Sequence, residues 1–329
     1  MLNEKSVTNE LKLNIFPLIS VSLRNIMQKI PEHKLLDLEE IRLRMMKPFM
    51  LVKGNMDYMV TIKGELTNQL TDVYFVTKDD IEKTFQLISK GSVYALEEEI
   101  KNGYITIPGG HRVGLAGKAV LHEGQIKTLK HICSLNIRIA REVIGAADNL
   151  IDYLTDERKA IYNTLILSPP KAGKTTLLRD LIRQLSNGDA KRNIKGYKIG
   201  LVDERSEIAC CYEGKPQNNV GIRTDVIDGC PKAVGIVMLL RSMSPDIIAT
   251  DEVGRHEDVL ALQEAINAGI TIIATAHGNN LEEIMRRPIM HELLENRMFK
   301  RYVFLGFSSG VGSLEKIFDE DFNLIKHFS

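Results

Sequence analysis

A lysine and two threonines in the middle of the chain have the spacing to hold a nucleotide phosphate. They belong to the run Gly173-Lys174-Thr175-Thr176, which follows the apolar residues 165–167 and precedes apolar residues at helical spacing. Strand, tight loop and helix in this order are typical of a phosphate-binding loop, whose backbone N–H groups surround an anion at the helix N-terminus. In such a loop Lys174 contacts the β- and γ-phosphates and the Thr175 hydroxyl ligates Mg²⁺. The pattern therefore predicts ATP and Mg²⁺ as ligands.

The predicted loop departs from the usual pattern at its first position. The pattern has glycine where this chain has Ser168. Serine costs more than glycine wherever the backbone φ angle is positive, so we expect the loop entry to have a different shape. The residues predicted to bind the nucleotide are Ser168, Pro169, Pro170, Lys171, Ala172, Gly173, Lys174, Thr175 and Thr176.

Two other predicted strands end in carboxylates. Residues 246–250 lead to Asp251 and Glu252, and residues 198–202 lead to Asp203-Glu204-Arg205. The first pair fits a Walker B element, in which Asp251 holds Mg²⁺ through water and Glu252 polarises the attacking water. The second group lies at a strand's C-terminal edge, where α/β sheets bind ligands.

A histidine and three arginines complete the set of candidate site residues. His277 follows the predicted strand 271–275, where it could contact the γ-phosphate or the catalytic water, although a lone histidine is often structural. Arg112, Arg138 and Arg141 precede the phosphate-binding loop in the chain. Each is either a surface charge or a ligand of a phosphate, and Arg112 could reach the nucleotide of a neighbouring subunit. Arg138 and Arg141 share a face if they lie on a helix and face opposite sides if they lie on a strand.

The apolar patterns predict the elements that position these residues. In the N-terminal half they indicate helices within 11–46, a strand-like segment that starts over 39–44, and a hairpin over 51–62. They also indicate a capped helix over 77–88, a helix over 94–101 and strands at 104–107 and 112–116. In the C-terminal half they indicate helices at 150–158, 232–241, 256–266 and 282–287, an active-side loop over 212–231, and strands at 302–307 and 314–318. We expect an α/β protein of two domains, an α+β domain over 1–142 and a nucleotide-binding domain over 143–329.

Composition excludes several other classes of protein. The 329 residues carry 43 basic and 43 acidic side chains, which argues against a general electrostatic attraction to nucleic acid. The four cysteines form no C-x-x-C pair, so we expect no structural zinc. No signal pattern begins the chain, and the longest apolar run, 233–240, is too short to span a bilayer. We therefore expect a cytoplasmic protein.

The motifs resemble those of the RecA-like P-loop ATPases, and among them the type II and type IV secretion ATPases. The matches are SPPKAGKTT, LVDERSEI at the Asp box, PDIIATDEVGR at Walker B and TAHG at the His box. The segments EIRLRMMKP, SVYALEEEIKNGYITIPGGHRVGLAGKAV and LNIRIAREVIG resemble, more narrowly, the stage III sporulation protein AA family. The tetracysteine of the secretion ATPases is missing, so the resemblance implies no zinc.

The resemblance implies a fold, an activity and partners. The fold is a RecA-like P-loop core, with a central and mainly parallel sheet flanked by helices, plus a smaller α+β N-terminal domain. The activity is ATP hydrolysis by a homo-oligomer, a hexameric ring, that powers or assembles a secretion-type channel between mother cell and forespore during sporulation. The partners are membrane proteins of that channel, on the cytoplasmic, mother-cell side. By carry-over, Asp203 and Glu204 fall in the Asp box and His277 in the His box, and Glu204, Glu252 and His277 are the catalytic candidates of the core.

Two other functions stay open on the sequence. RecA-like cores also serve as nucleic-acid-dependent ATPases, which the balanced charge disfavours. An ATP-binding scaffold without turnover is disfavoured by the presence of Glu252.

Overall fold

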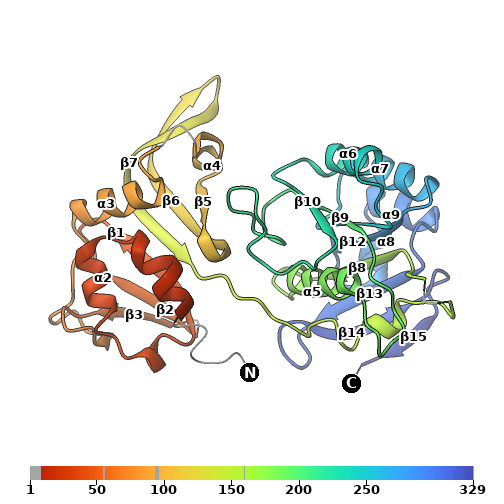
Figure 1. Cartoon of the computed structure of the whole chain (residues 1–329), viewed down its shortest axis with the longest axis horizontal. Coiled ribbons are helices and arrows are strands. Elements are labelled where there is room, and N and C mark those ends of the chain that lie inside the picture. Colours follow the sequence, from red (N-terminus) through yellow and green to blue (C-terminus); the bar gives the residue numbers. More distant parts are fainter. Residues whose placement is uncertain (1–8, 55, 93–95, 159, 329) are drawn as a thin grey trace. The chain divides into compact units, whose positions relative to one another are not determined.

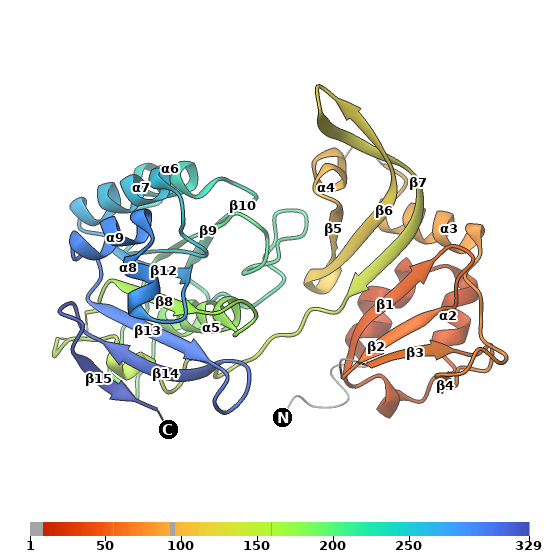
Figure 2. The same ribbon diagram turned by 180° about the vertical axis from the view of Figure 1, so that it is seen from behind.

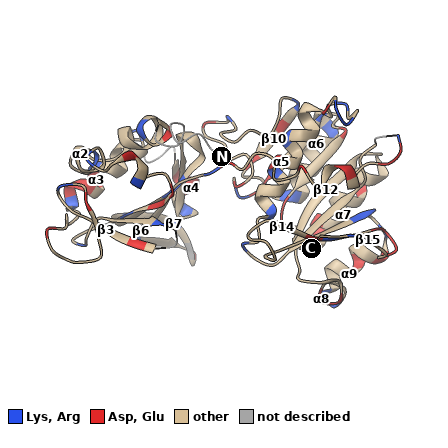
Figure 3. Cartoon of the chain, turned by 90° about the horizontal axis from the view of Figure 1, so that it is seen from below, with Lys and Arg blue, Asp and Glu red and all other residues tan. Residues whose placement is uncertain are grey.

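The structure is a computed structural model that describes residues 9–54, 56–92, 96–158 and 160–328. The chain divides into two compact units between Arg141 and Glu142, called unit 1 and unit 2 below (Figure 1 and, from behind, Figure 2). Lys, Arg, Asp and Glu are mixed over both units (Figure 3), as the balanced composition predicts. Within the described ranges, no helix is both long and apolar enough to cross a membrane.

Unit 1 is built on a seven-stranded antiparallel sheet with the order β4-β3-β2-β1-β7-β6-β5. Its strands are β1 (Leu38–Arg44), β2 (Met50–Lys53), β3 (Met56–Val60), β4 (Leu66–Thr67), β5 (Tyr104–Ile107), β6 (His111–His122) and β7 (Gln125–Arg138). Its helices are η1 (Leu11–Ile15), η2 (Phe16–Leu18), α2 (Val21–Met27), η3 (Glu32–Lys34), α3 (Lys78–Ile88), α4 (Glu97–Lys101) and η5 (Pro108–Gly110). Apolar side chains from the helices and from one face of the sheet form a single core.

Local sequence signals predicted much of unit 1. The hairpin over 51–62 is confirmed as the antiparallel pair β2 and β3. The cap of α3 is confirmed too, because the Thr77 hydroxyl accepts from the Asp80 N–H and the Asp80 carboxylate accepts from the Thr77 N–H. The predicted helices within 11–46 are short, since α2 ends at Met27, and the strand-like segment predicted over 39–44 is confirmed as β1. The predicted helix over 94–101 is described from 96 onward, as α4, and residues 94 and 95 lie outside the described residues.

The first strand residue of β6 is a histidine in the core of unit 1. His111 is fully buried, and its Nδ1 accepts from the Ala140 N–H at 3.0 Å. Its Nε2 has no hydrogen-bond partner among the described residues, and the nearest carboxylate oxygen, on Glu10, lies 3.9 Å away. Burial lowers the pKa of His111 from 6.5 to about 4, so the side chain stays neutral in the folded protein.

This buried histidine predicts an acid sensitivity of unit 1. In the unfolded chain His111 is protonated below about pH 6.5, whereas in the folded chain it stays neutral down to about pH 4. The free energy of unfolding therefore falls as the pH is lowered from 6.5 to 4. From this group alone, the free energy of unfolding should be ~2 kcal/mol lower at pH 5 than at pH 7. Urea unfolding of the full chain at both values measures it. His111→Asn keeps an acceptor for Ala140, and its pH dependence should be smaller by that amount. An unchanged pH dependence would show that His111 does not cause it.

Unit 2 is built on an eight-stranded sheet with the order β10-β9-β11-β12-β8-β13-β14-β15. The first six strands in this order, β10, β9, β11, β12, β8 and β13, are parallel to one another. The strands β14 and β15 are antiparallel additions at one edge. The strands are β8 (Thr164–Ser168), β9 (Ile199–Asp203), β10 (Thr224–Asp228), β11 (Ile247–Thr250), β12 (Thr271–His277), β13 (Arg301–Gly306), β14 (Ser313–Phe318) and β15 (Leu324–His327). The helices are η6 (Ile151–Tyr153), α5 (Lys174–Asn187), α6 (Lys232–Ser242), α7 (His256–Asn267), α8 (Leu281–Met285) and α9 (Pro288–Glu295).

Helices cover both faces of this parallel sheet. Alternate residues of β8 point to opposite faces, so that Ile166 packs with Leu181 of α5 while Leu165 and Leu167 belong to the core with α6, α7 and α9. The continuous apolar runs of the central strands are explained by this burial on both faces. The carboxyl ends of the parallel strands meet at one edge of the sheet, which is where the candidate site lies.

Several predictions for unit 2 are wrong. The helix predicted over 150–158 is only the short η6, because the chain turns back there: the Tyr162 N–H donates to the Leu154 carbonyl, and Thr155 bridges to Ile161. The loop predicted over 212–231 contains the strand β10. The elements α9 and β15 were not predicted. The helix predicted over 282–287 is confirmed as α8.

Candidate nucleotide site

The loop between β8 and α5 has the backbone conformation that an anion-binding loop requires. Gly173 precedes the first helical residue with a φ of 87°, in the left-handed region. A Cβ atom there would lie 3.1 Å from the Cα atom of Gly312, so both the conformation and the space favour glycine. The first intrahelical bond runs from the Leu177 N–H to the Gly173 carbonyl, and the preceding N–H groups, including those of Thr175 and Thr176, have no partner within the helix. These groups can bind a phosphate.

Ser168 fits the loop without the strain that its sequence position suggests. It ends β8 in extended conformation, fully buried, and its φ is not positive. Its hydroxyl donates to the Pro169 carbonyl at 2.7 Å and accepts from the Lys174 ammonium at 3.2 Å. Serine therefore costs nothing at this position, because glycine is needed only where φ is positive. The positive angle falls instead on Lys171, with a φ of 64°.

Lys174 links the loop to the end of a neighbouring strand. Its side chain is 6% exposed, and its Nζ lies 3.1 Å from Nδ1 of His277 at the end of β12. Burial lowers the pKa of Lys174, while the charges of Glu252 and Asp251 act in the opposite direction. Because an ammonium only donates, Nδ1 of His277 is the acceptor in this contact. In a neutral imidazole the proton is then on Nε2.

The other ring nitrogen of His277 contacts Glu252. Nε2 of His277 lies 3.1 Å from Oε1 of Glu252, so the protonated nitrogen donates to the carboxylate. Oε2 of Glu252 lies 2.8 Å from a guanidinium nitrogen of Arg205. The Glu252 backbone has a φ of 47°, and its N–H donates to the Thr275 hydroxyl at 2.9 Å. The structure thus brings Ser168, Lys174, His277 and Glu252 together and fixes the Glu252 carboxylate from two sides.

Asp251 has the features of a cation ligand. Its side chain is 2% exposed, and both carboxylate oxygens lack a hydrogen-bond partner among the described residues. Burial, together with the charges of Asp203 and Glu252, raises the pKa of Asp251 to about 7. Leaving a buried carboxylate without partners is costly, and a bound divalent cation removes the cost. The residues present therefore fit Mg²⁺, which Asp251 and the Thr175 hydroxyl would hold.

The two carboxylates that follow β9 have different surroundings. Asp203 is fully buried and accepts three backbone N–H groups, from Glu207, Ile208 and Ala209, although burial raises its pKa overall. The Asp203 carboxylate thus fixes the backbone of residues 207–209 by hydrogen bonds. Glu204 forms an ion pair with Lys232 and lies 3.9 Å from a guanidinium nitrogen of Arg255. Its contacts are thus with these cations, and its catalytic role stays a prediction.

The three predicted arginines belong to unit 1 and differ in how they are held. The Arg112 guanidinium lies 3.7 Å from the centre of the Tyr104 ring. Arg141 donates to the carbonyls of Leu36 and Leu38 at 3.2 and 3.1 Å. Arg138, at the end of β7, is 67% exposed, with Glu40 3.8 Å away. The strand alternative is confirmed for Arg138, which ends β7, and the contact with Glu40 is the one ion pair of this side chain among the described residues.

A cavity of about 300 Å³ adjoins Glu252 and His277. Its walls include Arg287, which donates to the His277 carbonyl at 2.8 Å and forms an ion pair with Glu283. Neither Arg287 nor Arg205 was predicted as a site residue. Arg205 directly follows the Asp203-Glu204 pair at a strand end, which is a signal that could have identified it, whereas no local pattern marks Arg287.

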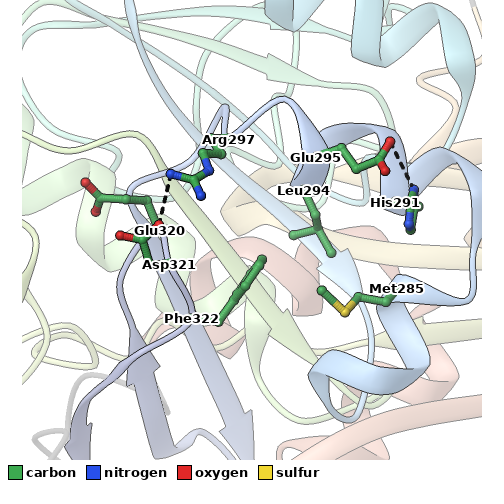
Figure 4. A pocket seen from close by; sticks show the side chains of 8 residues that line it. All are labelled: Met285, His291, Leu294, Glu295, Arg297, Glu320, Asp321 and Phe322. Atoms are coloured by element: carbon green, nitrogen blue, oxygen red, sulfur yellow. Dashed lines mark ion pairs between the residues drawn. The ribbon is translucent and has the colours of Figure 1, made fainter.

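A second cavity, of about 220 Å³, shares no residue with the first (Figure 4). Its charged groups are largely paired with each other, Arg297 with Asp321 at 2.9 Å and His291 with Glu295 at 3.3 Å. Apolar side chains of Met285, Leu294 and Phe322 lie between the two pairs. Because these charged groups are paired with each other, the lining of this cavity does not indicate a particular class of ligand.

The fold of the chain is that of the RecA-like secretion ATPases, a P-loop core with a mainly parallel sheet plus a smaller α+β unit. The X-ray structure of the ATPase DotB from Yersinia pseudotuberculosis aligns over 95% of this chain and 81% of its own, with a TM-score of 0.54 and 15% identity. The structure of the pilus retraction motor PilT with bound ADP aligns over 81% of this chain and 74% of its own, with a TM-score of 0.51 and 16% identity. At these identities the likeness concerns the fold alone.

The chain belongs to the family described as Sporulation stage III, protein AA, which matches residues 9–325. It is 44% identical over 304 residues to stage III sporulation protein AA of Bacillus subtilis strain 168, an alignment that covers 92% of this chain and 94% of that protein. The resemblance that was inferred from the sequence motifs is thereby confirmed over nearly the full length.

Proposed function

We propose that the chain hydrolyses ATP, with Mg²⁺, to power or assemble a secretion-type channel between mother cell and forespore. The observation that carries the proposal is the contact series Lys174–His277–Glu252, beside the unpartnered carboxylate of Asp251. These groups come from the ends of β11 and β12 and from the phosphate-binding loop, the parts that phosphoryl transfer requires. The ADP in the PilT structure supports a nucleotide as the ligand of this fold.

Each residue then has a defined task. Lys174 exchanges its contacts with Ser168 and His277 for the β- and γ-phosphates, and this exchange frees Nδ1 of His277. Glu252, oriented by His277 and Arg205, accepts a proton from the water that attacks the γ-phosphorus. Bound Mg²⁺ supplies positive charge to the phosphate oxygens. The N–H groups at the start of α5 hold the phosphates in place.

The assembly and location form part of the same proposal. We infer a homo-oligomeric ring, a hexamer, whose partners are membrane proteins of the channel on the cytoplasmic, mother-cell side. The family membership and the secretion-ATPase fold support this inference. In a ring, a nucleotide at a subunit boundary can receive an arginine from the neighbouring subunit, which gives Arg112, Arg138 and Arg141 their predicted role.

Removing the Lys174 charge tests nucleotide binding. Lys174→Ala should weaken the binding of an ATP analogue by roughly 100-fold or more, ~3 kcal/mol, because it removes charge-assisted hydrogen bonds to two phosphates. Titration calorimetry with Mg²⁺ measures the affinity. Lys191→Ala removes an exposed lysine outside the predicted loop and should bind like the wild type. Equal affinity in Lys174→Ala and wild type would mean that the loop does not bind phosphate as proposed.

A further inference from the structure

The hairpin of β6 and β7 extends beyond the sheet of unit 1. β5 pairs with β6 only as far as Gly114, and β1 pairs with β7 only from Ser134 onward. Residues 118–130, called the arm below, pair only with one another. Figures 1 and 2 show the arm projecting from the end of the sheet in both views. It therefore presents side chains that the strands of the sheet do not cover.

The arm begins at a close backbone crossing. A Cβ atom on Gly117 would lie 2.7 Å from the Lys130 carbonyl oxygen and 3.0 Å from that of His131. The register of the two strands also shifts here, between Ala116 and Lys118. A bulge of this kind bends a hairpin and increases its twist. The arm therefore bends away from the direction of β6 and β7 within the sheet.

The tip of the arm exposes an apolar pair. Leu121 is 61% exposed and stands directly opposite Ile126, which is 44% exposed. Directly opposite residues of an antiparallel pair point to the same face, so the two side chains form one apolar surface. Ala119, two residues before Leu121 on β6, is exposed on the same face, whereas Leu129 opposite it packs against the core of unit 1.

Positive charge lies on the arm near the apolar pair, with Lys118 and Lys130 on the face opposite to Leu121 and Ile126. Lys118, Lys127 and Lys130 are exposed, and none of them forms an ion pair within the described part of the chain. Glu123 is the sole acidic residue from 118 to 131. Lys118 stands directly opposite Lys130, an arrangement that costs stability because like charges face each other. An external anionic surface would relieve this repulsion.

We propose that the arm binds the surface of a bilayer that contains anionic phospholipid. The arm meets the bilayer with its tip, so that Leu121 and Ile126 enter the boundary between headgroups and acyl chains. The three lysines, which lie on both faces of the hairpin, then contact lipid phosphates around it. The exposed apolar pair favours lipid over nucleic acid, because single-stranded nucleic acid is bound by aromatic stacking and residues 118–131 contain no Phe, Tyr or Trp. This contact is direct, and so goes beyond the proposed attachment through membrane proteins.

Vesicle binding by the full chain tests the arm. Vesicles of equal parts phosphatidylcholine and phosphatidylglycerol should bind the wild type, whereas vesicles of phosphatidylcholine alone should bind it weakly. Replacing Lys118, Lys127 and Lys130 by glutamine should lower the affinity about 100-fold, because each lysine near an anionic surface contributes roughly fivefold. The double variant Leu121→Ser/Ile126→Ser should lower it at least about tenfold. Ile62→Ser/Leu70→Ser changes two equally exposed apolar residues outside the arm and should bind like the wild type.

Fluorescence locates the inserted residue. The chain contains no tryptophan, so Leu121→Trp introduces a single reporter at the tip. Its emission should shift to shorter wavelength on the anionic vesicles, while Leu70→Trp should not respond. ATP turnover in solution is measured separately and should be unchanged by the arm variants, so that a failure here does not bear on the proposed hydrolysis.

Three results would overturn the proposal. One is equal binding of both vesicle types by wild type and lysine variant, and another is an unshifted Leu121→Trp emission. The third is binding of single-stranded DNA, or self-association, that depends on the same lysines while vesicles are not bound. Circular dichroism of each variant verifies that the fold is retained.

Discussion

Replacing Glu252 by glutamine is expected to lower ATP turnover by ~10²–10⁴-fold and to leave nucleotide binding intact. The amide keeps the shape of the side chain, and its oxygen can still accept from either His277 or Arg205, but it cannot accept the proton of the attacking water. The nucleotide contacts are assigned to the loop and to Lys174. The variant should therefore accumulate as an ATP-bound assembly.

Phosphate release and nucleotide retention together measure this effect. Glu257→Gln provides a matched control, because Glu257 is an exposed carboxylate five residues further along the chain, in the first turn of α7. The control should hydrolyse ATP at the wild-type rate. Turnover by Glu252→Gln at the same rate as the control would remove Glu252 from the mechanism.

Loss of an arginine from unit 1 is expected to have an even larger effect. An arginine that neutralises the γ-phosphate in the transition state contributes ~10³–10⁵-fold to turnover in related systems. Of the three candidates, Arg138 is the strongest, because its side chain is 67% exposed and its one ion-pair contact, Glu40, is 3.8 Å away. Arg141 already donates to two carbonyls. We therefore expect Arg138→Ala to lose most turnover and Arg141→Ala to lose less.

Mixing of subunits shows whether Arg138 acts on a neighbour's nucleotide. Rings that combine Glu252→Gln subunits with Arg138→Ala subunits contain some boundaries at which both groups are intact. If Arg138 acts between subunits, these boundaries restore part of the turnover. Wild-type turnover by assembled Arg138→Ala rings would contradict the role, as would unrestored turnover in mixed rings of proven composition.

The core of unit 2 could be predicted because its signals are local. The loop before α5 and the acids after β11 each lie within a few residues of the strand that positions them. The parallel topology then brings the strand ends to one edge. The edge elements β10 and β15 gave weaker signals, since the side chains of β15 are all exposed and those of β10 are at most half-buried. Their pairing depends on neighbours far away in the sequence.

The contacts within the site could not be predicted in the same way. The Lys174–His277 contact joins residues 103 positions apart, and no local pattern encodes it. The backbone angle of Ser168 could not be predicted either, because it depends on where β8 ends, which the glycine pattern alone does not determine. The helix predicted over 150–158 failed for a related reason. The apolar residues Leu150, Ile151 and Leu154 are buried as a helix would bury them, but the chain turns back immediately after them.

The central claim is that this chain turns over ATP with the groups assembled at the strand ends. The most direct measurement is the release of inorganic phosphate from ATP by the purified full chain, with Mg²⁺ and with EDTA, alone and with the cytosolic part of a proposed membrane partner. We expect Mg²⁺-dependent release that Lys174→Ala abolishes. An assembled protein that binds ATP but releases no phosphate above background, with and without the partner, would contradict the claim.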